Sequence, residues 1–241
     1  MHSPRRHPER TLLAATPILA AALLVLGGCG GSSKASSGNG LAAKSPEQIV
    51  QAAQTAARGA ATVHISGSTF DEKEPISLNM ELVAGKGAKG HITLKGLGVE
   101  VVEIEHAFYI QGSSAFYRSV AGPAAAQLLA GKWLKAPSST GEFARLAQLT
   151  DLGALVDRTL SSHGALSSSG TATIAGQKAV GVTDSAKGGT LYVAATGTPY
   201  PLEIVKKGQG AASITFDRWN QPVTLDAPAH AININQLQNG A

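Results

Sequence analysis

The sequence predicts an α+β fold in which helices gather on one face of a large antiparallel sheet. Hydrophobic residues change from a spacing of about 3.6 to a spacing of 2 near Thr62, which is typical of a helix followed by strands. Short glycine-containing segments separate these strands up to residue 113, and a second set of strands follows residue 167. Because such short connections join antiparallel neighbours, both sets are predicted to form meanders.

The first helix is predicted to begin at Pro46. Ser45 can cap it, Pro46 suits the first turn, and Gln48 completes a capping box. Hydrophobic residues then recur at helical spacing, and Gly59 is a natural end. Residues 30–44 are rich in glycine and serine, so they are expected to form a flexible tether in front of this helix.

The first set of strands shows its alternation most clearly in residues 75–84, where Ile76, Leu78, Met80 and Leu82 share one face. The other members are predicted at residues 62–70, 91–95, 99–105 and 107–111. The alternation slips at Val101-Val102, which predicts a β-bulge.

The middle of the chain, residues 113–163, is predicted to be mostly helical. Helices are expected at residues 124–129, 141–149 and 151–163, with an extended segment at 131–135. The second set of strands is expected at residues 168–174, 178–184, 190–195, 202–207 and 211–219, with a short strand around Val223.

The N-terminal segment is typical of a secretory signal. Three arginines lie in the first ten residues, and residues 12–26 carry no charge but are too few to span a bilayer. The motif Leu26-Gly27-Gly28-Cys29 resembles the lipobox of bacterial lipoproteins. This resemblance implies cleavage before Cys29 and lipidation of its thiol, with acyl chains such as palmitate. An ordinary signal peptide with an incidental cysteine is the alternative.

This interpretation divides the chain into three parts. Residues 1–28 are a lipoprotein signal peptide that is removed, residues 29–44 are the lipidated cysteine and its tether, and residues 45–241 are a single domain. The domain is then expected on the extracytoplasmic face of the cell membrane, as a monomer. The net charge of the chain is +4, and the remainder is only +2 without the signal segment, which holds three arginines and one glutamate. Scattered basic residues without interleaved aromatic residues give no nucleic-acid site.

Several local motifs, together with this order of elements, resemble the actinobacterial LppX/LprG family of lipid-carrier lipoproteins, related in fold to LolA and LolB. The motifs are Gly131-Lys-Trp-Leu-Lys135, Gly189-Thr-Leu-Tyr-Val193, Pro199-Tyr-Pro-Leu-Glu-Ile204, Ser213-Ile-Thr-Phe-Asp217, Trp219-Asn220 and Pro222-Val223. The resemblance implies a half-barrel whose concave face, together with the helices, encloses an apolar cavity for a lipid or glycolipid. It implies no catalytic residue, no cofactor and no metal, and it allows an envelope transporter as a partner.

Apolar strand residues are the candidates to line such a cavity. They are Leu78, Met80, Leu82, Ile92, Leu94, Val99, Val101, Phe108, Ile110, Leu191 and Val193. Trp133 and Tyr200 are candidates for its mouth. The alternative is a non-enzymatic scaffold or sensor lipoprotein in which the same residues make a filled core.

An enzyme is the third hypothesis, and the sequence offers little for it. Glu100, Glu103, Glu105 and His106 form the densest ionisable group, but Glu103 and Glu105 are predicted to lie on a solvated outer face. Residues 85–90 match G-x-G-x-x-G, yet a strand follows where a dinucleotide site needs a helix, so a hairpin turn is predicted. No G-x-S-x-G motif is present.

Overall fold

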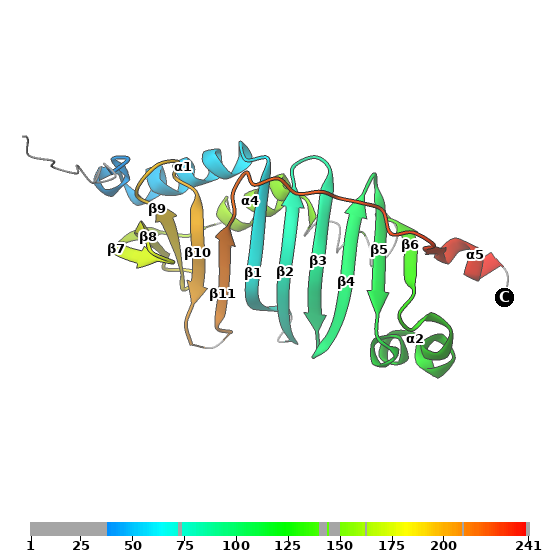
Figure 1. The fold of residues 1–241 in the computed structure, drawn as a ribbon. Coiled ribbons are helices and arrows are strands. Elements are labelled where there is room, and N and C mark those ends of the chain that lie inside the picture. The colour runs from blue at the N-terminus through cyan, green and yellow to red at the C-terminus, as the bar shows by residue number, and fades with distance from the viewer. Residues whose placement is uncertain are drawn as a thin grey trace, which may run out of the picture. The chain divides into compact units, whose positions relative to one another are not determined.

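A computed structural model describes residues 38–71, 74–139, 144, 150–161, 163–208 and 210–239. The predicted α+β class is confirmed. Within these residues, twelve strands form one large, curved, mostly antiparallel sheet that does not close into a barrel. Two helices, α1 and α4, pack against each other and against one face of the sheet, which we call the inner face (Figure 1).

The elements follow one another in the predicted order of helix, strands, helices and strands. They are η1 Leu41–Ala43, α1 Pro46–Arg58, β1 Thr62–Asp71, β2 Glu74–Val83, β3 Gly87–Leu94, β4 Leu97–Ile104, β5 Ala107–Gly112, α2 Ser114–Leu129, β6 Trp133–Pro137, α4 Leu152–Leu160, β7 Leu166–Ile174, β8 Gln177–Asp184, β9 Gly189–Ala194, β10 Pro201–Lys206, β11 Ala212–Asp217, β12 Ile232–Asn233 and α5 Ile234–Asn239. No helix in the described part of the chain is both long and apolar enough to cross a bilayer.

The sheet joins the two predicted meanders side by side. Its strand order is β12-β6-β5-β4-β3-β2-β1-β11-β10-β9-β8-β7, so β1 and β11 form the junction. There Ile65 lies opposite Met80 on one neighbour and Phe216 on the other. After β11 the chain runs along one edge of the sheet, across β1 to β5, and β12 then pairs with β6 in parallel (Figure 1).

The first helix forms as its sequence predicts. The backbone N–H of Gln48 donates to Ser45 Oγ over 3.3 Å, and the backbone N–H of Ser45 donates to Gln48 Oε1 over 3.1 Å. This capping box begins α1, and Gly59 ends it. Its buried face packs onto the core through Ile49 and Ala53.

Several local predictions are wrong. β4 pairs with both neighbours without a shift, so no bulge exists at Val101-Val102; the register shifts instead at Ser168/Thr171 and Pro201/Glu203. No strand forms around Val223. The helix expected at 124–129 is the second part of the longer α2, which breaks at Gly122, where φ is 85°. The helix expected at 141–149 lies outside the described residues, except for helical Ala144.

Strand direction defines two edges of the sheet. Because neighbouring strands run in opposite directions, the β1–β2, β3–β4, β8–β9 and β10–β11 turns fall at the same edge as α2. We call this edge the α2 edge (Figure 1). The β2–β3, β4–β5, β7–β8 and β9–β10 turns lie at the opposite edge, and the G-x-G-x-x-G segment forms the first of these, as predicted.

Candidate functional site

The inner face of the sheet is apolar from β6 to β8. Residues paired across an antiparallel register point to the same side, and side chains alternate between sides along each strand. All eleven residues predicted to line a cavity therefore share the inner face: Leu78, Met80, Leu82, Ile92, Leu94, Val99, Val101, Phe108, Ile110, Leu191 and Val193. They belong to a single hydrophobic cluster with the apolar sides of α1 and α4.

A cavity of about 420 Å³ lies between these two helices and the second meander. Val50 of α1 and Leu160 of α4 line it from the helix side. From the sheet side it is lined by Val182, Leu191 and Ile204, which face one another across β8, β9 and β10. Its volume falls within the range of roughly 300–1,000 Å³ that is usual for small-molecule sites.

Polar side chains surround the cavity where it reaches the α2 edge. They are His163, Asp184, Lys187 and Lys206. Asp184 Oδ1 accepts from the backbone N–H groups of Ala186 (2.8 Å), Lys187 (3.1 Å) and Gly164 (3.3 Å). Although desolvation opposes it, these N–H groups hold the pKa of the Asp184 carboxyl below its usual range. The carboxylate thus ties the α4–β7 connection to the β8–β9 turn at the mouth.

Of the eleven predicted residues, only Leu191 lines this cavity. On the inner face of the first meander most of the described apolar residues are buried, whereas Ile76, Leu78 and Leu94 are only partly buried. Phe108 is fully buried, and the ring of Phe116 from α2 packs directly onto Gly112. A Cβ atom at Gly112 would lie only 2.4 Å from Phe116 Cδ1. Among the described residues, the filled-core hypothesis therefore fits the buried inner-face residues of the first meander, and the cavity hypothesis fits β8 to β11.

Most of the residues that line this cavity are not among the eleven predicted ones. Val182 and Ile204 follow the same alternation of apolar residues as the eleven predicted ones, so this pattern could have identified them. What the sequence does not contain is the position of α1 and α4, which leaves a space over these strands. Val50 and Leu160, on the helices, could be found only from their helical spacing.

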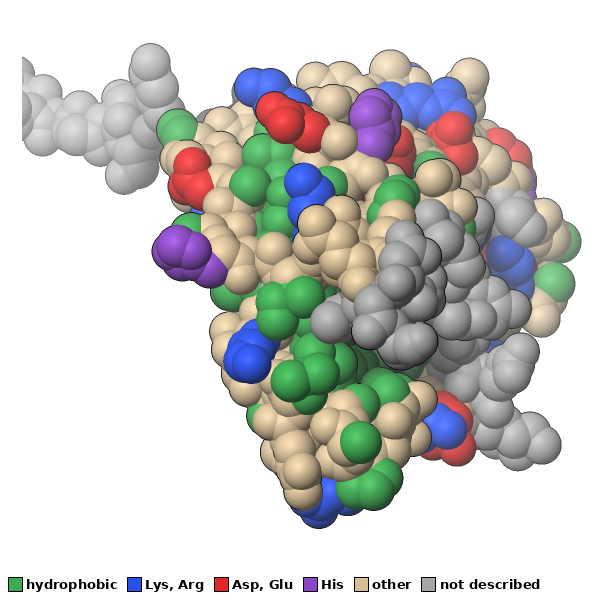
Figure 2. All heavy atoms as spheres, turned by 90° about the vertical axis from the view of Figure 1, so that its right-hand side faces the viewer, with side chains coloured by type: hydrophobic (Ala, Val, Ile, Leu, Met, Phe, Trp, Pro, Cys, Tyr) green, Lys and Arg blue, Asp and Glu red, His purple; other side chains and the backbone are tan. Residues whose placement is uncertain are grey.

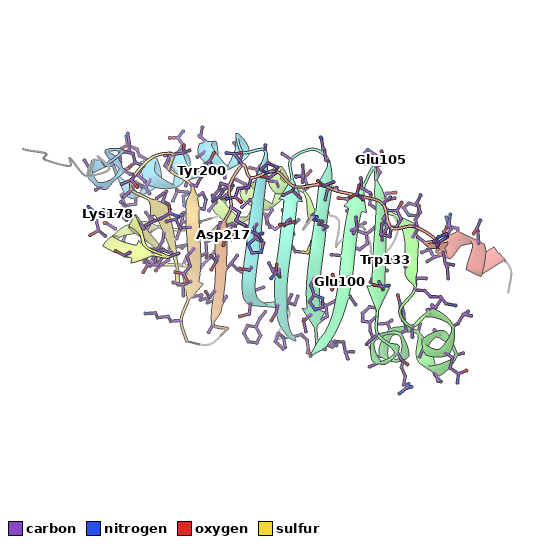
Figure 3. The ribbon with its side chains drawn as sticks, viewed as in Figure 1. Glu100, Glu105, Trp133, Lys178, Tyr200 and Asp217 are labelled. Carbon is purple, nitrogen blue, oxygen red and sulfur yellow. The ribbon has the colours of Figure 1, made fainter. Side chains whose placement is uncertain are left out.

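The two aromatic residues expected at the mouth are elsewhere. Trp133 points to the outer face, because its neighbour Leu134 faces Ile110 on the inner side. Tyr200 lies in the β9–β10 connection at the opposite edge, where its ring stacks on Trp219 with centroids 4.6 Å apart. Trp219 in turn contacts α4 around Leu155, where a space of only about 10 Å³ remains. Figure 3 shows Trp133 and Tyr200 at well-separated parts of the sheet.

The outer face of the sheet carries paired charges around β1, β3, β4 and β11, and a small hydrophobic cluster on β7 to β10. His64 Nδ1 lies 2.6 Å from Asp217 Oδ1, and His91 Nδ1 lies 2.9 Å from Glu100 Oε1. The prediction that Glu103 shares this face is wrong. Since β4 has no bulge, Glu103 follows Val101 on the inner face, where it accepts a hydrogen bond of 2.8 Å from the hydroxyl of Thr150.

The ionisable groups do not converge on one point. Glu105 and His106 form the β4–β5 turn, and Glu100 points outward (Figure 3). In the part of the chain that the structure describes, no three histidine, cysteine, aspartate or glutamate side chains lie together as metal ligands.

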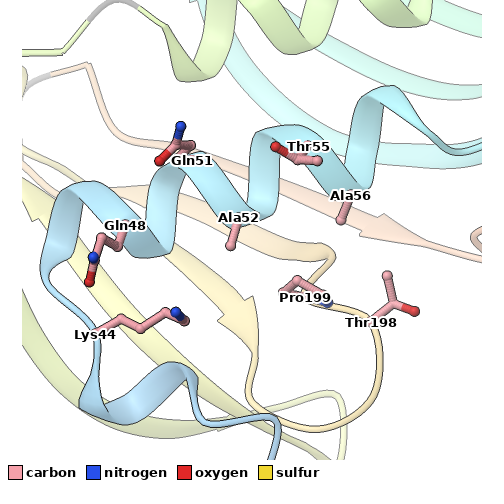
Figure 4. Close-up of a pocket in the computed structure, with 8 residues that line it drawn as sticks. All are labelled: Lys44, Gln48, Gln51, Ala52, Thr55, Ala56, Thr198 and Pro199. Carbon is pink, nitrogen blue, oxygen red and sulfur yellow. The ribbon is translucent and has the colours of Figure 1, made fainter.

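A second depression lies along the solvent side of α1 (Figure 4). It measures about 500 Å³ and runs between the helix and the β9–β10 connection at Thr198 and Pro199. Most of its lining residues are polar, but Ala52, Ala56, Pro199 and the aliphatic parts of the other side chains make its surface mainly apolar. This groove is more open to solvent than the cavity on the inner face, so it would enclose less of a bound acyl chain.

Two solved structures of mycobacterial proteins have a similar fold. The crystal structure of LprF from Mycobacterium bovis matches with a TM-score of 0.54 and 19% identity, covering 76% of this chain and 97% of that one. The crystal structure of the lipoprotein LppX from Mycobacterium tuberculosis matches with a TM-score of 0.52 and 18% identity, covering 75% and 98%. No family model and no curated protein matches the sequence. The predicted resemblance is thus confirmed for the fold.

Proposed function

We propose that this chain is an envelope lipoprotein that binds a lipid or glycolipid by enclosing an acyl chain in the cavity between α1, α4 and β8 to β11. The observation that carries the proposal is the apolar space of about 420 Å³ on the inner face, open beside polar side chains at the α2 edge. An acyl chain fits the lining of Val50, Leu160 and Val182, and a polar headgroup fits the mouth.

The mechanism is removal of hydrocarbon from water. Each CH₂ group that enters the cavity contributes about 0.8 kcal/mol, so a chain of ten such groups outweighs the loss of its own freedom. Since no reaction is involved, the protein needs no catalytic group and no cofactor. Release requires α1 and α4 to move away from the second meander, or the mouth to meet an acceptor for the lipid.

The proposed location follows from the lipobox. Cys29 and the rest of residues 1–37 lie outside the described residues, so lipidation of Cys29 stays a prediction. The anchor would keep a monomeric domain on the extracytoplasmic face of the cell membrane, within reach of lipids and of an envelope transporter. Replacing Cys29 with alanine should release the protein from the membrane fraction of cells.

Native mass spectrometry of the chain from Gly30 onward tests the cavity. All packing described above lies C-terminal to this residue, so the domain keeps its core. We expect a bound lipid in the purified protein, or uptake of a labelled fatty acid. Leu191→Trp should fill the space and reduce uptake at least tenfold, whereas Tyr192→Trp, on the opposite face of the same strand, should leave uptake unchanged.

The second candidate is a scaffold or sensor lipoprotein that holds no lipid. The filled inner face of β2 to β6 favours it, because most of the predicted lining is ordinary core. A protein that is purified empty, and that takes up no fatty acid while its fold is intact, would decide for this candidate.

A further inference from the structure

We propose that the α2 edge of the sheet is a docking surface for a bilayer that contains anionic lipids. This proposal goes beyond lipid binding in the cavity, because it concerns a surface outside the cavity and an interaction with lipid headgroups. Three independent features of the same edge support it: exposed apolar side chains, an excess of basic side chains, and the mouth of the cavity.

The apolar feature is the position of the large exposed hydrophobic residues. Among the described residues these are Phe70, Val120 and Leu128, with exposed fractions of 47%, 62% and 55%. Phe70 stands at the β1–β2 turn, and the other two are on α2, so all three lie at the α2 edge. Figure 2 views the molecule from the β6 end of the sheet, and hydrophobic side chains gather in the lower part of this view, at the height of α2.

Among the described side chains at this edge, basic residues outnumber acidic ones. The described basic side chains are Lys95, Arg118, Lys132, Lys187, Lys206 and Lys207, and the described acidic ones are Glu74 and Asp184. Asp184 is already occupied by backbone N–H groups. The turns of the opposite edge carry both signs, with Lys86 in one and Glu105 in another, and none of their side chains is a large exposed hydrophobe.

The arrangement fits a membrane better than another occupant. Phe70 is separated from the α2 residues along the edge, with Lys95 in the β3–β4 turn between them (Figure 1). Scattered apolar side chains between lysines are typical of segments that insert shallowly at the headgroup level of an anionic bilayer. A second copy of the chain would place one excess of positive charge against another.

Docking at this edge would bring the bilayer to the mouth of the cavity. Gly189 and Lys206 line it, and both lie at the ends of strands that meet the α2 edge. A bilayer on this edge would therefore lie against the mouth, and an acyl chain would pass between bilayer and cavity without crossing bulk water.

Vesicle co-sedimentation of the chain from Gly30 onward tests the proposal. We expect binding to phosphatidylcholine vesicles that include phosphatidylglycerol, and much weaker binding to phosphatidylcholine alone or at high salt. The double variant Lys95→Asn/Lys207→Gln should weaken binding about 25-fold, at roughly fivefold for each lysine near an anionic surface. Val120→Ser with Leu128→Ser should weaken it about tenfold.

The matched control is Lys86→Gln/Lys178→Gln, which removes the same charge from exposed lysines at the opposite edge. It should bind as the parent does. Equal weakening by both lysine pairs would mean that only net charge matters, and no binding to any vesicle would point to a protein partner; either result overturns the proposal. Lipid content is measured on the same samples. A cavity that still holds lipid while vesicle binding fails rejects the docking proposal alone, and an empty cavity with intact vesicle binding rejects the proposed function alone.

Discussion

The two meanders present the same kind of inner face but use it differently. In β2 to β5 most of the described inner-face residues are core: Phe108, Val101 and Ile92 are almost fully buried, and Phe116 of α2 packs onto the sheet. In β8 to β10 the residues Val182 and Leu191 border an open space of about 420 Å³. Strand alternation thus tells which side of a sheet is apolar, but it does not tell whether anything fills the space above it.

The contrast comes from the course of α4. Leu152, Leu155 and Leu160 of α4 line a space of only about 10 Å³ together with Phe216 and Trp219. Toward its last turn, at Leu160, the larger cavity opens beneath it. The helix is therefore seated at the opposite edge of the sheet and leaves room at the α2 edge.

The largest expected effect compares the two halves directly. Phe108→Ala, in the filled half, should lower the free energy of unfolding by about 3–5 kcal/mol, because the fully buried ring leaves a void in rigid surroundings. Leu191→Ala, beside the existing cavity, should cost about 2 kcal/mol, at the low end for such a change. Urea denaturation measures both values. Equal losses would contradict the distinction between a filled and a hollow half.

The next prediction concerns the mouth. A Cβ atom at Gly164 would lie 2.5 Å from Ala186 Cβ, so Gly164→Val should cost about 1–3 kcal/mol or displace the β8–β9 turn. Gly189→Ala is the matched control at the same mouth, since its nearest contact would be an ordinary 3.8 Å from Val205 O. Thermal unfolding should separate the two variants. If both are tolerated equally, the mouth is looser than the geometry indicates.

A smaller effect is expected at the hydrogen bonds that join α2 to the first meander. The Tyr117 hydroxyl accepts from the Gly112 N–H (3.2 Å) and donates to the Lys132 carbonyl (3.4 Å). Tyr117→Phe should therefore cost about 1–2 kcal/mol in chemical denaturation, because it leaves buried backbone groups without a partner.

The same tyrosine predicts a pH dependence. Burial raises the pKa of the Tyr117 hydroxyl, although the Gly112 N–H acts to lower it. Because the folded-state pKa is above the unfolded value of about 10, the contribution of Tyr117 is complete below that pH and is lost as the pH rises through the folded value. Melting temperatures across this alkaline range should fall less in Tyr117→Phe than in the parent. Parallel curves would contradict this role.

The smallest effect is expected at the contact between α1 and α4, the two helices that line the cavity. Arg58 of α1 donates to Asp157 of α4 over 2.7 Å, but both side chains are about half exposed. Arg58→Gln should therefore cost only about 0.2–1 kcal/mol, and about 1 M salt should remove the difference. A larger loss would mean that the α1–α4 contact stabilises the fold as much as the Tyr117 hydrogen bonds of α2 do, and it would contradict the difference between the two meanders.

Sequence patterns predicted what depends on neighbours along the chain. The capping box at Ser45, the end of α1 at Gly59 and the alternation in residues 75–84 each involve groups a few residues apart. The errors occurred where distant contacts decide. The chain after β11 reaches β6 through β12 and forms no strand at Val223, and Glu103 meets Thr150 on the inner face.

The sequence by itself determined the α+β class, the order of the elements and which face of most strands is apolar, because these follow from residue spacing and short connections. Tertiary structure alone decided which part of the inner face is hollow. That choice depends on where Leu160 and Val50 sit above Val182 and Leu191, and these residues are brought together only when β1 pairs with β11 and joins the two meanders. Residue spacing along the chain does not tell how far a helix lies from the sheet, because contacts between distant parts of the chain set that distance.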